Sequence, residues 1–434
     1  MRFCLFVSIG FAVSLAQTSA LDLPQSFTCT FPASPRPQDN PLPPFMSLMI
    51  RGVQPTSIGA YKDLSANQES LWSQRPTKAY AWSPQFSANG DDLLTISDNY
   101  ATILRSKDGS LVKKIQHAGD VFTATFSPDG KYVATASWDR TSRVTRVEDG
   151  ATILSTQHGD TARTAAFSPD SKKLLSTSND KTARIISLEE PQTIFTIKHD
   201  ANVNFGLFSP DGQWAATASD DGKIKITSTK SGELAREINF LADVKSLRFS
   251  ADGKWLSSIS ADRKVHWHRM DDPKTHFEVS HERFIRSAVF SPDGKYLLTA
   301  SEDKTAKLMD VETGKVLQTI KHKDMIRTAQ FSPDSRLILT ASLDNTARVI
   351  RISDGSIVRE IEHSGSVMGA AFSPDGSAIA THTWDNTASI VSLDSDKVQT
   401  ILHGNTVSAA VFSPDSKTLA TTDKSGGVHL IQRK

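Results

Sequence analysis

The stretch "FSPDGKYVATASWDRTSRV", residues 126–144, recurs along the chain with small changes. The phenylalanine that opens each copy returns every 41 residues, with a last interval of 40: Phe126, Phe167, Phe208, Phe249, Phe290, Phe331, Phe372 and Phe412. Counting back 40 residues from Phe126 gives Phe86, which opens a degraded copy. A fixed period of this length predicts a repeat architecture in which each copy forms one structural unit.

Each copy reads as four short strands. Around Phe126 we expect strands over Val121–Phe126, Tyr132–Ser137, Ser142–Val147 and Ala151–Gln157. "SPDG" provides the first reversal, because proline presets one turn dihedral and Asp-Gly favours a tight turn. Short, evenly spaced strands without helical periodicity indicate an all-β protein.

One such unit cannot bury both of its faces, whereas units stacked radially in a closed ring cover one another. We therefore predict a β-propeller with four antiparallel strands per blade. The last copy supplies only three strands before Lys434, so we expect a strand from residues 69–77, "ESLWSQRPT", to complete it. Nine blades are expected; an eight-bladed ring with one copy packed outside is the alternative.

The copies resemble the WD40 repeat family in their period, in a histidine nine residues before the phenylalanine and in an aspartate thirteen residues after it. The resemblance covers about Glu69 to Lys434. It implies hydrogen-bonded sets of histidine, serine or threonine, and aspartate. The sets are His117, Ser137, Asp139; His158, Ser178, Asp180; His199, Ser219, Asp221; His281, Ser301, Asp303; His322, Ser342, Asp344; and His363, Thr383, Asp385.

These sets have the composition of a catalytic triad, but six equivalent copies indicate a repeated structural network. A nucleophile site needs one strained serine beside an oxyanion hole. The copies also depart from the family pattern. The tryptophan usual on the third strand is absent throughout, Phe240 replaces one histidine, and Ser425 stands at the last aspartate position.

The composition excludes several function classes. Lysine plus arginine number 49 and aspartate plus glutamate 48, so no basic field predicts nucleic-acid binding. No nucleotide loop, zinc-hydrolase motif or cofactor motif is present. His266, His268 and His276 cluster near His281, and the i, i+2 pair could face one metal ion. His281 belongs to a repeat set, however, so we expect no metal site there and no cofactor.

The N-terminal region differs from the repeats. Residues 1–20 have a positive start, an apolar run and small residues at the end, which predicts a cleaved secretory signal peptide. An uncleaved membrane anchor and a buried helix are the alternatives. Residues 21–66 carry eight prolines and read as a tail or strap, and residues 67–434 as the propeller. Of the two cysteines, Cys4 would leave with the signal and Cys29 would remain alone.

The resemblance implies that partners bind the end of the ring with the histidine loops and aspartate turns. There we expect the residue four before each phenylalanine and the residue before each aspartate to vary freely. An aromatic-methionine cluster would face a basic arc, a pattern typical of a protein-binding surface; alternatively, these side chains fill the channel mouth. The candidates are Trp82, Phe122, Trp138, Arg163, Lys245, Arg286, Arg327, Met368 and Trp384.

The sequence thus favours a non-enzymatic, monomeric scaffold in an extracytoplasmic compartment, periplasmic or secreted, that binds a protein or peptide. After signal cleavage the chain would not be integral to the membrane. One alternative is an envelope component similar to TolB-type propellers, which also carry "SPDG" turns. Another is a propeller enzyme or small-ligand binder that uses the central channel. Fold alone does not decide among these functions.

Overall fold

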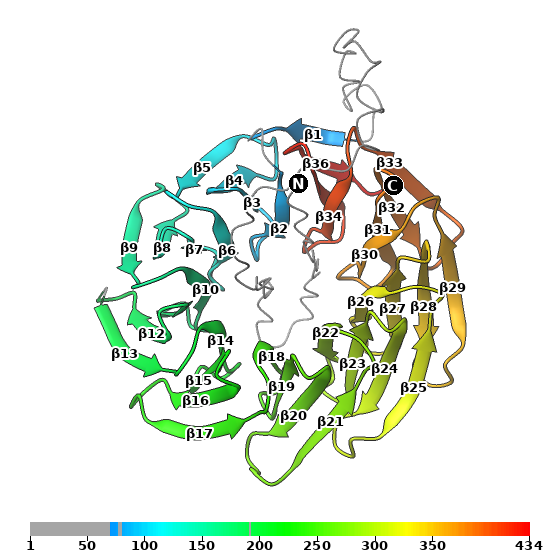
Figure 1. Ribbon diagram of the computed structural model, residues 1–434. Coiled ribbons are helices and arrows are strands. Elements are labelled where there is room, and N and C mark those ends of the chain that lie inside the picture. Colours follow the sequence, from blue (N-terminus) through cyan, green and yellow to red (C-terminus); the bar gives the residue numbers. More distant parts are fainter. Residues whose placement is uncertain (1–69, 77–79, 191) are drawn as a thin grey trace, which may run out of the picture.

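A computed structural model of the chain describes residues 70–76, 80–190 and 192–434. These residues form nine four-stranded antiparallel sheets arranged in a ring (Figure 1). The predicted nine-bladed, all-β propeller is confirmed, and the eight-bladed alternative is wrong. The predicted signal peptide, the proline-rich segment, Cys4 and Cys29 lie outside the described residues. Within them, no helix is long and apolar enough to cross a membrane.

The strands take corresponding places in every blade. The innermost strands are β2 (Trp82–Phe86), β6 (Val121–Phe126), β10 (Ala162–Phe167), β14 (Val203–Phe208), β18 (Val244–Phe249), β22 (Ile285–Phe290), β26 (Ile326–Phe331), β30 (Val367–Phe372) and β34 (Val407–Phe412). The second strands are β3 (Asp92–Ser97), β7 (Tyr132–Ser137), β11 (Lys173–Ser178), β15 (Trp214–Ser219), β19 (Trp255–Ser260), β23 (Tyr296–Ser301), β27 (Leu337–Ser342), β31 (Ala378–Thr383) and β35 (Thr418–Asp423).

The remaining strands form the outer half of each blade. The third strands are β4 (Tyr100–Arg105), β8 (Thr141–Arg146), β12 (Thr182–Ser187), β16 (Lys223–Ser228), β20 (Lys264–Arg269), β24 (Thr305–Asp310), β28 (Thr346–Arg351), β32 (Thr387–Ser392) and β36 (Val428–Gln432). The outermost strands are β5 (Leu111–Gln116), β9 (Thr152–Gln157), β13 (Gln192–Lys198), β17 (Leu234–Asn239), β21 (His276–Ser280), β25 (Val316–Lys321), β29 (Ile357–Glu362), β33 (Val398–Leu402) and β1 (Ser70–Gln74).

The ring closes through its first strand. β1 pairs antiparallel with β36, with Trp72 opposite Leu430 and Gln74 opposite Val428, and so becomes the outer strand of the ninth blade. This pairing confirms the predicted completion of the last blade. Trp72 is buried, and its indole nitrogen donates a hydrogen bond of 2.7 Å to the backbone oxygen of Ser106 in the first blade. We call β1, paired in this way, the latch. It joins the two ends of the described chain.

Burial follows the position of a strand in its blade. The second strands are buried almost along their whole length because both of their faces lie against neighbouring blades. The outer strands are mostly exposed, and β13 buries only one of its seven residues. This gradient explains why inner strands are rich in Ala, Val, Leu and Thr whereas outer strands carry charges.

The "SPDG" segments form tight turns between the first two strands. In the second blade the Gly130 N–H donates to the Ser127 carbonyl at 2.9 Å, and the Ser127 hydroxyl donates to Asp129 at 2.6 Å. Gly130 has a φ of +71°, which glycine adopts without steric cost. Ser171 takes the same place with a φ of +60° in the next blade.

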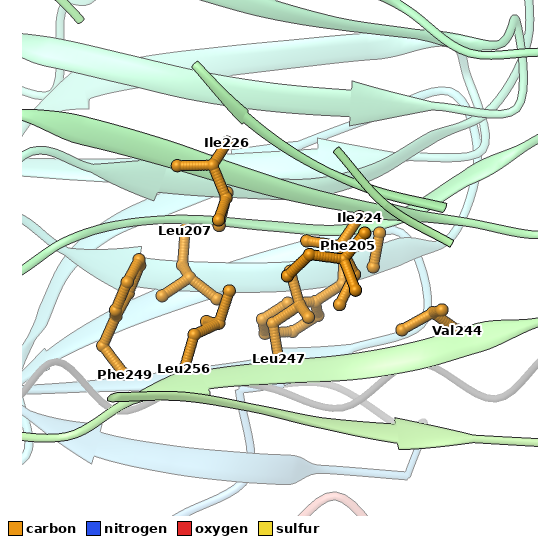
Figure 2. Packing of buried hydrophobic residues seen from close by; sticks show 11 residues of the cluster. Phe205, Leu207, Ile224, Ile226, Val244, Leu247, Phe249 and Leu256 are labelled. Atoms are coloured by element: carbon orange, nitrogen blue, oxygen red, sulfur yellow. The ribbon is translucent and has the colours of Figure 1, made fainter. Parts of the chain in front are cut away.

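Each interface between blades is an apolar cluster. Figure 2 shows the one between the fourth and fifth blades, where Phe205, Leu207 and Ile226 face Leu247 and Leu256. Both sets of side chains are almost fully buried. Burying such side chains stabilises each by about 1.5–3 kcal/mol, so the ring is held by contacts between blades. Trp267 adds a polar link, because its indole nitrogen donates at 3.0 Å to the Val311 carbonyl of the sixth blade.

Candidate functional site

One end of the ring carries two kinds of connection, the loops before the innermost strands and the turns between the second and third strands. We call this end the turn face; in the second blade it consists of residues 117–120 and 138–140. Loop and turn are joined directly, since the Trp138 N–H donates to the Asp120 carbonyl at 2.9 Å. The Trp384 N–H makes the matching bond, 3.0 Å long, to the Ser366 carbonyl.

The buried side chains of the turn face include the histidine–aspartate pairs. In five of the six predicted sets, histidine Nδ1 is hydrogen-bonded to aspartate Oδ2. The distances are 2.9 Å for His117 and Asp139, 3.2 Å for His158 and Asp180, 3.0 Å for His199 and Asp221, 2.8 Å for His281 and Asp303, and 2.9 Å for His322 and Asp344. Each pair ties the loop of its blade to the turn.

The hydroxyl on the second histidine nitrogen is not the one predicted. Nε2 bonds to the side chain two residues before the predicted serine: Thr135, Ser176, Thr217, Thr299 and Thr340, at 2.7–2.9 Å. The predicted serines serve the backbone instead: Ser137 donates to the Gly119 carbonyl at 2.9 Å and accepts from the Asp139 N–H at 3.0 Å. Ser178, Ser219, Ser301 and Ser342 make equivalent bonds.

The sixth set is built differently. Asp385 accepts hydrogen bonds from the hydroxyls of Ser364, Thr383 and Thr387 rather than from its histidine. Within the described residues, Nε2 of His363 is buried without a hydrogen-bond partner. The expected three-residue arrangement is therefore not formed in the eighth blade, because the Ser364 hydroxyl has taken the place of the imidazole.

The electrostatics of the sets fit a structural role. Burial lowers the pKa of His117 and His281 below 6.5, and the neighbouring carboxylates only partly offset it. Burial would raise the pKa of Asp139, but hydrogen bonds from Thr141, the Ala118 backbone and His117 outweigh burial and hold that pKa at about 2. At neutral pH each set is a neutral imidazole beside a carboxylate. None of the five predicted serines faces its histidine. The hydroxyl on Nε2 belongs to threonine in four sets and to Ser176 in the set of His158, and Ser176 is fully buried, so it is not an exposed nucleophile.

The residues four before each phenylalanine share a backbone feature. In each inner pair from the second to the ninth blade, the register shifts at this position, for example between Val121 and Thr123 and between Ile326 and Thr328. The position is thus a β-bulge, which turns one side chain out of the regular alternation. Trp82 lies in the wider irregularity of the first blade.

The aromatic candidates form one clear group in the second blade. Phe122 and Trp138 pack edge to face with ring centroids 5.6 Å apart, and the Arg163 guanidinium lies 5.4 Å from the Phe122 centroid. Trp138 is 48% exposed, so its ring is supported from one side and open on the other. We call these three residues the aromatic anchor.

The other aromatic candidates are more dispersed. Trp384 is 54% exposed in the eighth blade, with Lys424 Nζ 6.0 Å from its ring centroid. Trp82 and Met368 are half-buried, and Trp82 packs against the core of the first two blades. Two further apolar side chains, Leu241 and Phe284, protrude from loops of the turn face. Spacing from the repeat phenylalanines could not single them out, because these loop residues follow no repeated residue type.

The expected basic arc does not present free cations to solvent. Lys245 pairs with Asp220 at 2.6 Å and with Asp243 at 2.9 Å, and Arg286 pairs with Glu302. Arg163 is buried and donates to Asn179 at 2.7 Å. Arg327 is buried as well. The bulge directs these side chains against neighbours on their own face, so among the candidate residues the exposed side chains are aromatic rather than basic.

The histidine-rich stretch of the fifth blade is partly an aromatic cluster. Phe240 stands where other blades have histidine, and its ring centroid lies 4.7 Å from that of His266. His268 stacks on His276 at 5.5 Å, and His281 belongs to the network of the sixth blade. The four histidines are therefore not gathered around one point.

The structure brings together a different group that could hold a metal ion. Among the described residues, one cluster of three such side chains lies close enough: His403, Asp423 and His429 in the ninth blade, which we call the latch cluster. Burial and the neighbouring His429 lower the pKa of His403 to about 3. Burial opposes ionisation of Asp423, but hydrogen bonds from His429, Ser425 and the Gly427 backbone outweigh it and hold the carboxyl pKa well below its usual range.

A closed ring of four-stranded blades with buried histidine–aspartate pairs defines a WD40-type β-propeller. The family model "IFT122 first beta-propeller" matches residues 80–309, more than half of the chain. The model "WD domain, G-beta repeat" matches residues 314–351, 355–392 and 396–431. The chain belongs to the WD40-repeat β-propeller family, whose members typically act as protein-interaction scaffolds.

Other comparisons add only the fold. No curated protein matches the chain. Among solved structures, the crystal structure of the computationally designed Ika8 protein is similar, with a TM-score of 0.57 and 17% sequence identity. The match covers 84% of this chain and 100% of that one. At this identity the likeness carries no information about partners.

Proposed function

We propose that this chain is a non-enzymatic scaffold that binds a protein or peptide on the turn face. The observation that carries the proposal is the aromatic anchor. The exposed Trp138 ring packs on Phe122, which lies in turn against Arg163, so the tryptophan loses little conformational freedom on binding. Tryptophan is enriched among residues that dominate binding energy. Trp384 offers a second exposed indole on the same face.

The non-enzymatic part of the proposal is supported by the hydroxyls of the repeat sets. The predicted serines donate to backbone carbonyls, and the histidines use both nitrogens within the sets. The one serine that bonds to a histidine Nε2, Ser176, is fully buried. These groups hold the loops that carry the anchor. Their function is to present a rigid surface.

The proposal is tested by affinity capture from the organism's own extracts, with quantitative comparison of variants. We expect Trp138→Ala combined with Trp384→Ala to reduce recovery of the specific partner at least tenfold. Leu234→Ala combined with Ile357→Ala is the matched control, because these side chains are similarly exposed but lie on outer strands. Equal recovery with the turn-face variant and the control would contradict this assignment.

We further propose that the propeller works in an extracytoplasmic compartment, on the basis of residues 1–20 alone. Intact-mass measurement with cell fractionation tests this separately from partner binding. A mass short by sixteen or twenty residues in a periplasmic or secreted fraction would support export. A full-length mass in the cytosol would contradict it.

A further inference from the structure

The blade that closes the ring reverses the residue order found elsewhere. In the second blade a serine ends the second strand and the aspartate follows two residues later, as Ser137 and Asp139. In the ninth blade Asp423 ends the second strand and Ser425 follows. The carboxylate therefore lies inside the blade, where it is fully buried, rather than in the turn.

The reversal brings the carboxylate to two imidazoles. His403 comes from the loop before β34, and His429 comes from β36, at the place where the second blade has Arg143. One nitrogen of each ring and one oxygen of Asp423 lie within 4.8 Å of one another. His429 Nε2 and Asp423 Oδ2 are 3.1 Å apart. All three side chains are at least 97% buried.

The hydrogen bonding of this cluster is incomplete. Nδ1 of His403 is buried without a hydrogen-bond partner among the described residues, whereas Nδ1 of the corresponding His117 reaches a carboxylate at 2.9 Å. Asp423 Oδ1 accepts the Ser425 N–H, the Ser425 hydroxyl and the Gly427 N–H, while Oδ2 has only His429. An unpaired buried nitrogen beside a carboxylate is an arrangement that a bound cation would satisfy.

The backbone leaves room beside these atoms. A Cβ at position 427 would be in hard contact with Asp423 Oδ2 and His429 Nε2. Gly427 does not have the positive φ found at Gly426, so its backbone conformation does not demand glycine. The absence of a side chain at 427 keeps open the space next to the two ligand atoms.

We propose that His403, Asp423 and His429 bind a zinc-type divalent metal ion that fastens the closing blade. Two imidazoles and one carboxylate are ligands that Zn²⁺ accepts, leaving one position for water. Ligands around a tetrahedral zinc lie roughly 3.3 Å apart, so the cluster must contract onto the ion. Because the ligands are buried, the ion would have a structural role.

The site would act on ring closure through a second layer of contacts. His429 Nδ1 is hydrogen-bonded at 2.9 Å to the hydroxyl of Ser73 on β1, the strand that completes the blade. Such a bond to the outer nitrogen orients a metal-bound imidazole. Metal binding would therefore stabilise the pairing of β1 with β36. The competing explanation is a proton on His429, which would form an ion pair with Asp423 without any metal.

The test uses the full chain, purified without a histidine tag, stripped with a chelator and titrated with zinc chloride. We expect one zinc ion per chain by elemental analysis. We also expect a Tm increase of about 3–4 °C when free zinc is about a hundred times its Kd. Cobalt should give the visible absorption of a four-coordinate ion. Folded wild-type protein that binds less than a tenth of an equivalent, with no change in Tm, would overturn the proposal in favour of the proton.

Variants locate the ion. Asp423→Asn and His403→Gln should each lower zinc binding at least a hundredfold and abolish the Tm response. His281→Gln is the matched control, because it breaks an ordinary histidine–aspartate pair and should lower Tm while one zinc still binds. Cys29→Ser and His268→Gln should also keep one zinc. Zinc retained by both Asp423→Asn and His403→Gln would overturn the assignment. If these two variants do not fold, Gly427→Ala is used instead, because its Cβ would meet the two ligand atoms. Loss of the cobalt spectrum in Gly427→Ala would support the site, and an unchanged spectrum would overturn it.

Discussion

Single hydrogen bonds decide what the repeated histidines do. His322 uses Nδ1 for Asp344 and Nε2 for Thr340, at 2.9 Å each, so its ring is fixed and neutral. Burial, only partly offset by Asp344, lowers its pKa below 6.5. His117, His158, His199 and His281 behave in the same way. The sets therefore couple the stability of the propeller to protonation.

We predict that acid destabilises the ring in two stages. The unfolded chain takes up protons on these histidines as pH falls below about 6.5, while the folded chain does not, so stability falls with pH in this range. A second loss follows below about pH 4, because Asp139 and Asp344 have folded-state pKa values of about 2 against an ordinary 3.8. Tm measured from pH 8 to pH 3 with a chelator present checks this.

His322→Gln is the control variant for the first stage. Glutamine keeps polar atoms near Asp344 and Thr340 but cannot be protonated, so its decline in Tm between about pH 6.5 and 5 should be shallower than that of the wild type. A wild-type Tm that stays constant between pH 7 and 5 would contradict the proposed linkage.

The spacing of the repeats predicted the histidines and aspartates but not the hydroxyl partner. Thr135 and Ser137 are two residues apart on β7, so their side chains share one face of the strand. Alternation alone cannot choose between them. Depth below the turn decides, because the imidazole extends inward from the loop to Thr135 while Ser137 lies level with the loop backbone.

At the level of strands, the bulge in each inner pair was hidden from the sequence. The residue four before each phenylalanine was predicted to vary freely, and its chemistry does vary. The direction in which this side chain points depends on the register shift. The shift leaves Arg163 and Arg327 buried, while Phe122 supports the exposed Trp138. No residue type marks a bulge that accepts Phe, Arg, Lys and Ser alike.

Crowding of the inner strands is the second feature at this scale. Gly206 on β14 packs so closely on β11 that a Cβ would lie 2.6 Å from Thr177 Cγ2 and 3.0 Å from Leu175 Cδ2. We predict that Gly206→Val lowers the free energy of unfolding by about 1–3 kcal/mol through overpacking. Denaturant unfolding measures the change.

A double mutant separates overpacking from other effects of the valine. Thr177→Ser removes the methyl group that the new side chain meets and keeps the hydroxyl that bonds to Thr164. In this background Gly206→Val should lower the free energy of unfolding clearly less than in the wild type. The coupling energy between the two substitutions should be at least about 0.5 kcal/mol. If the two substitutions lower the free energy of unfolding by strictly additive amounts, the valine is not crowded by the Thr177 methyl group.

For the whole molecule, the period of the repeats and the three-stranded last copy favoured nine blades over eight and predicted that β1 completes the last blade. Both expectations come from counting the copies and from the open edge that a three-stranded last blade would leave. The latch cluster could not be predicted in this way. It depends on a single reversal of serine and aspartate at residues 423–425, which looks like loss of the repeat pattern until β36 places His429 beside it.

The latch itself gives the last prediction. Trp72 is 8% exposed, packs in the cluster that joins the ninth and first blades, and donates to the Ser106 carbonyl. Trp72→Ala should therefore cost about 3–5 kcal/mol in the free energy of unfolding and open the ring to proteolysis near β1. Leu71→Ala, on the same strand but 51% exposed, should change it by less than about 0.5 kcal/mol. If both variants unfold at the same denaturant concentration, β1 does not hold the propeller closed, because Trp72, unlike the exposed Leu71, joins the ninth blade to the first.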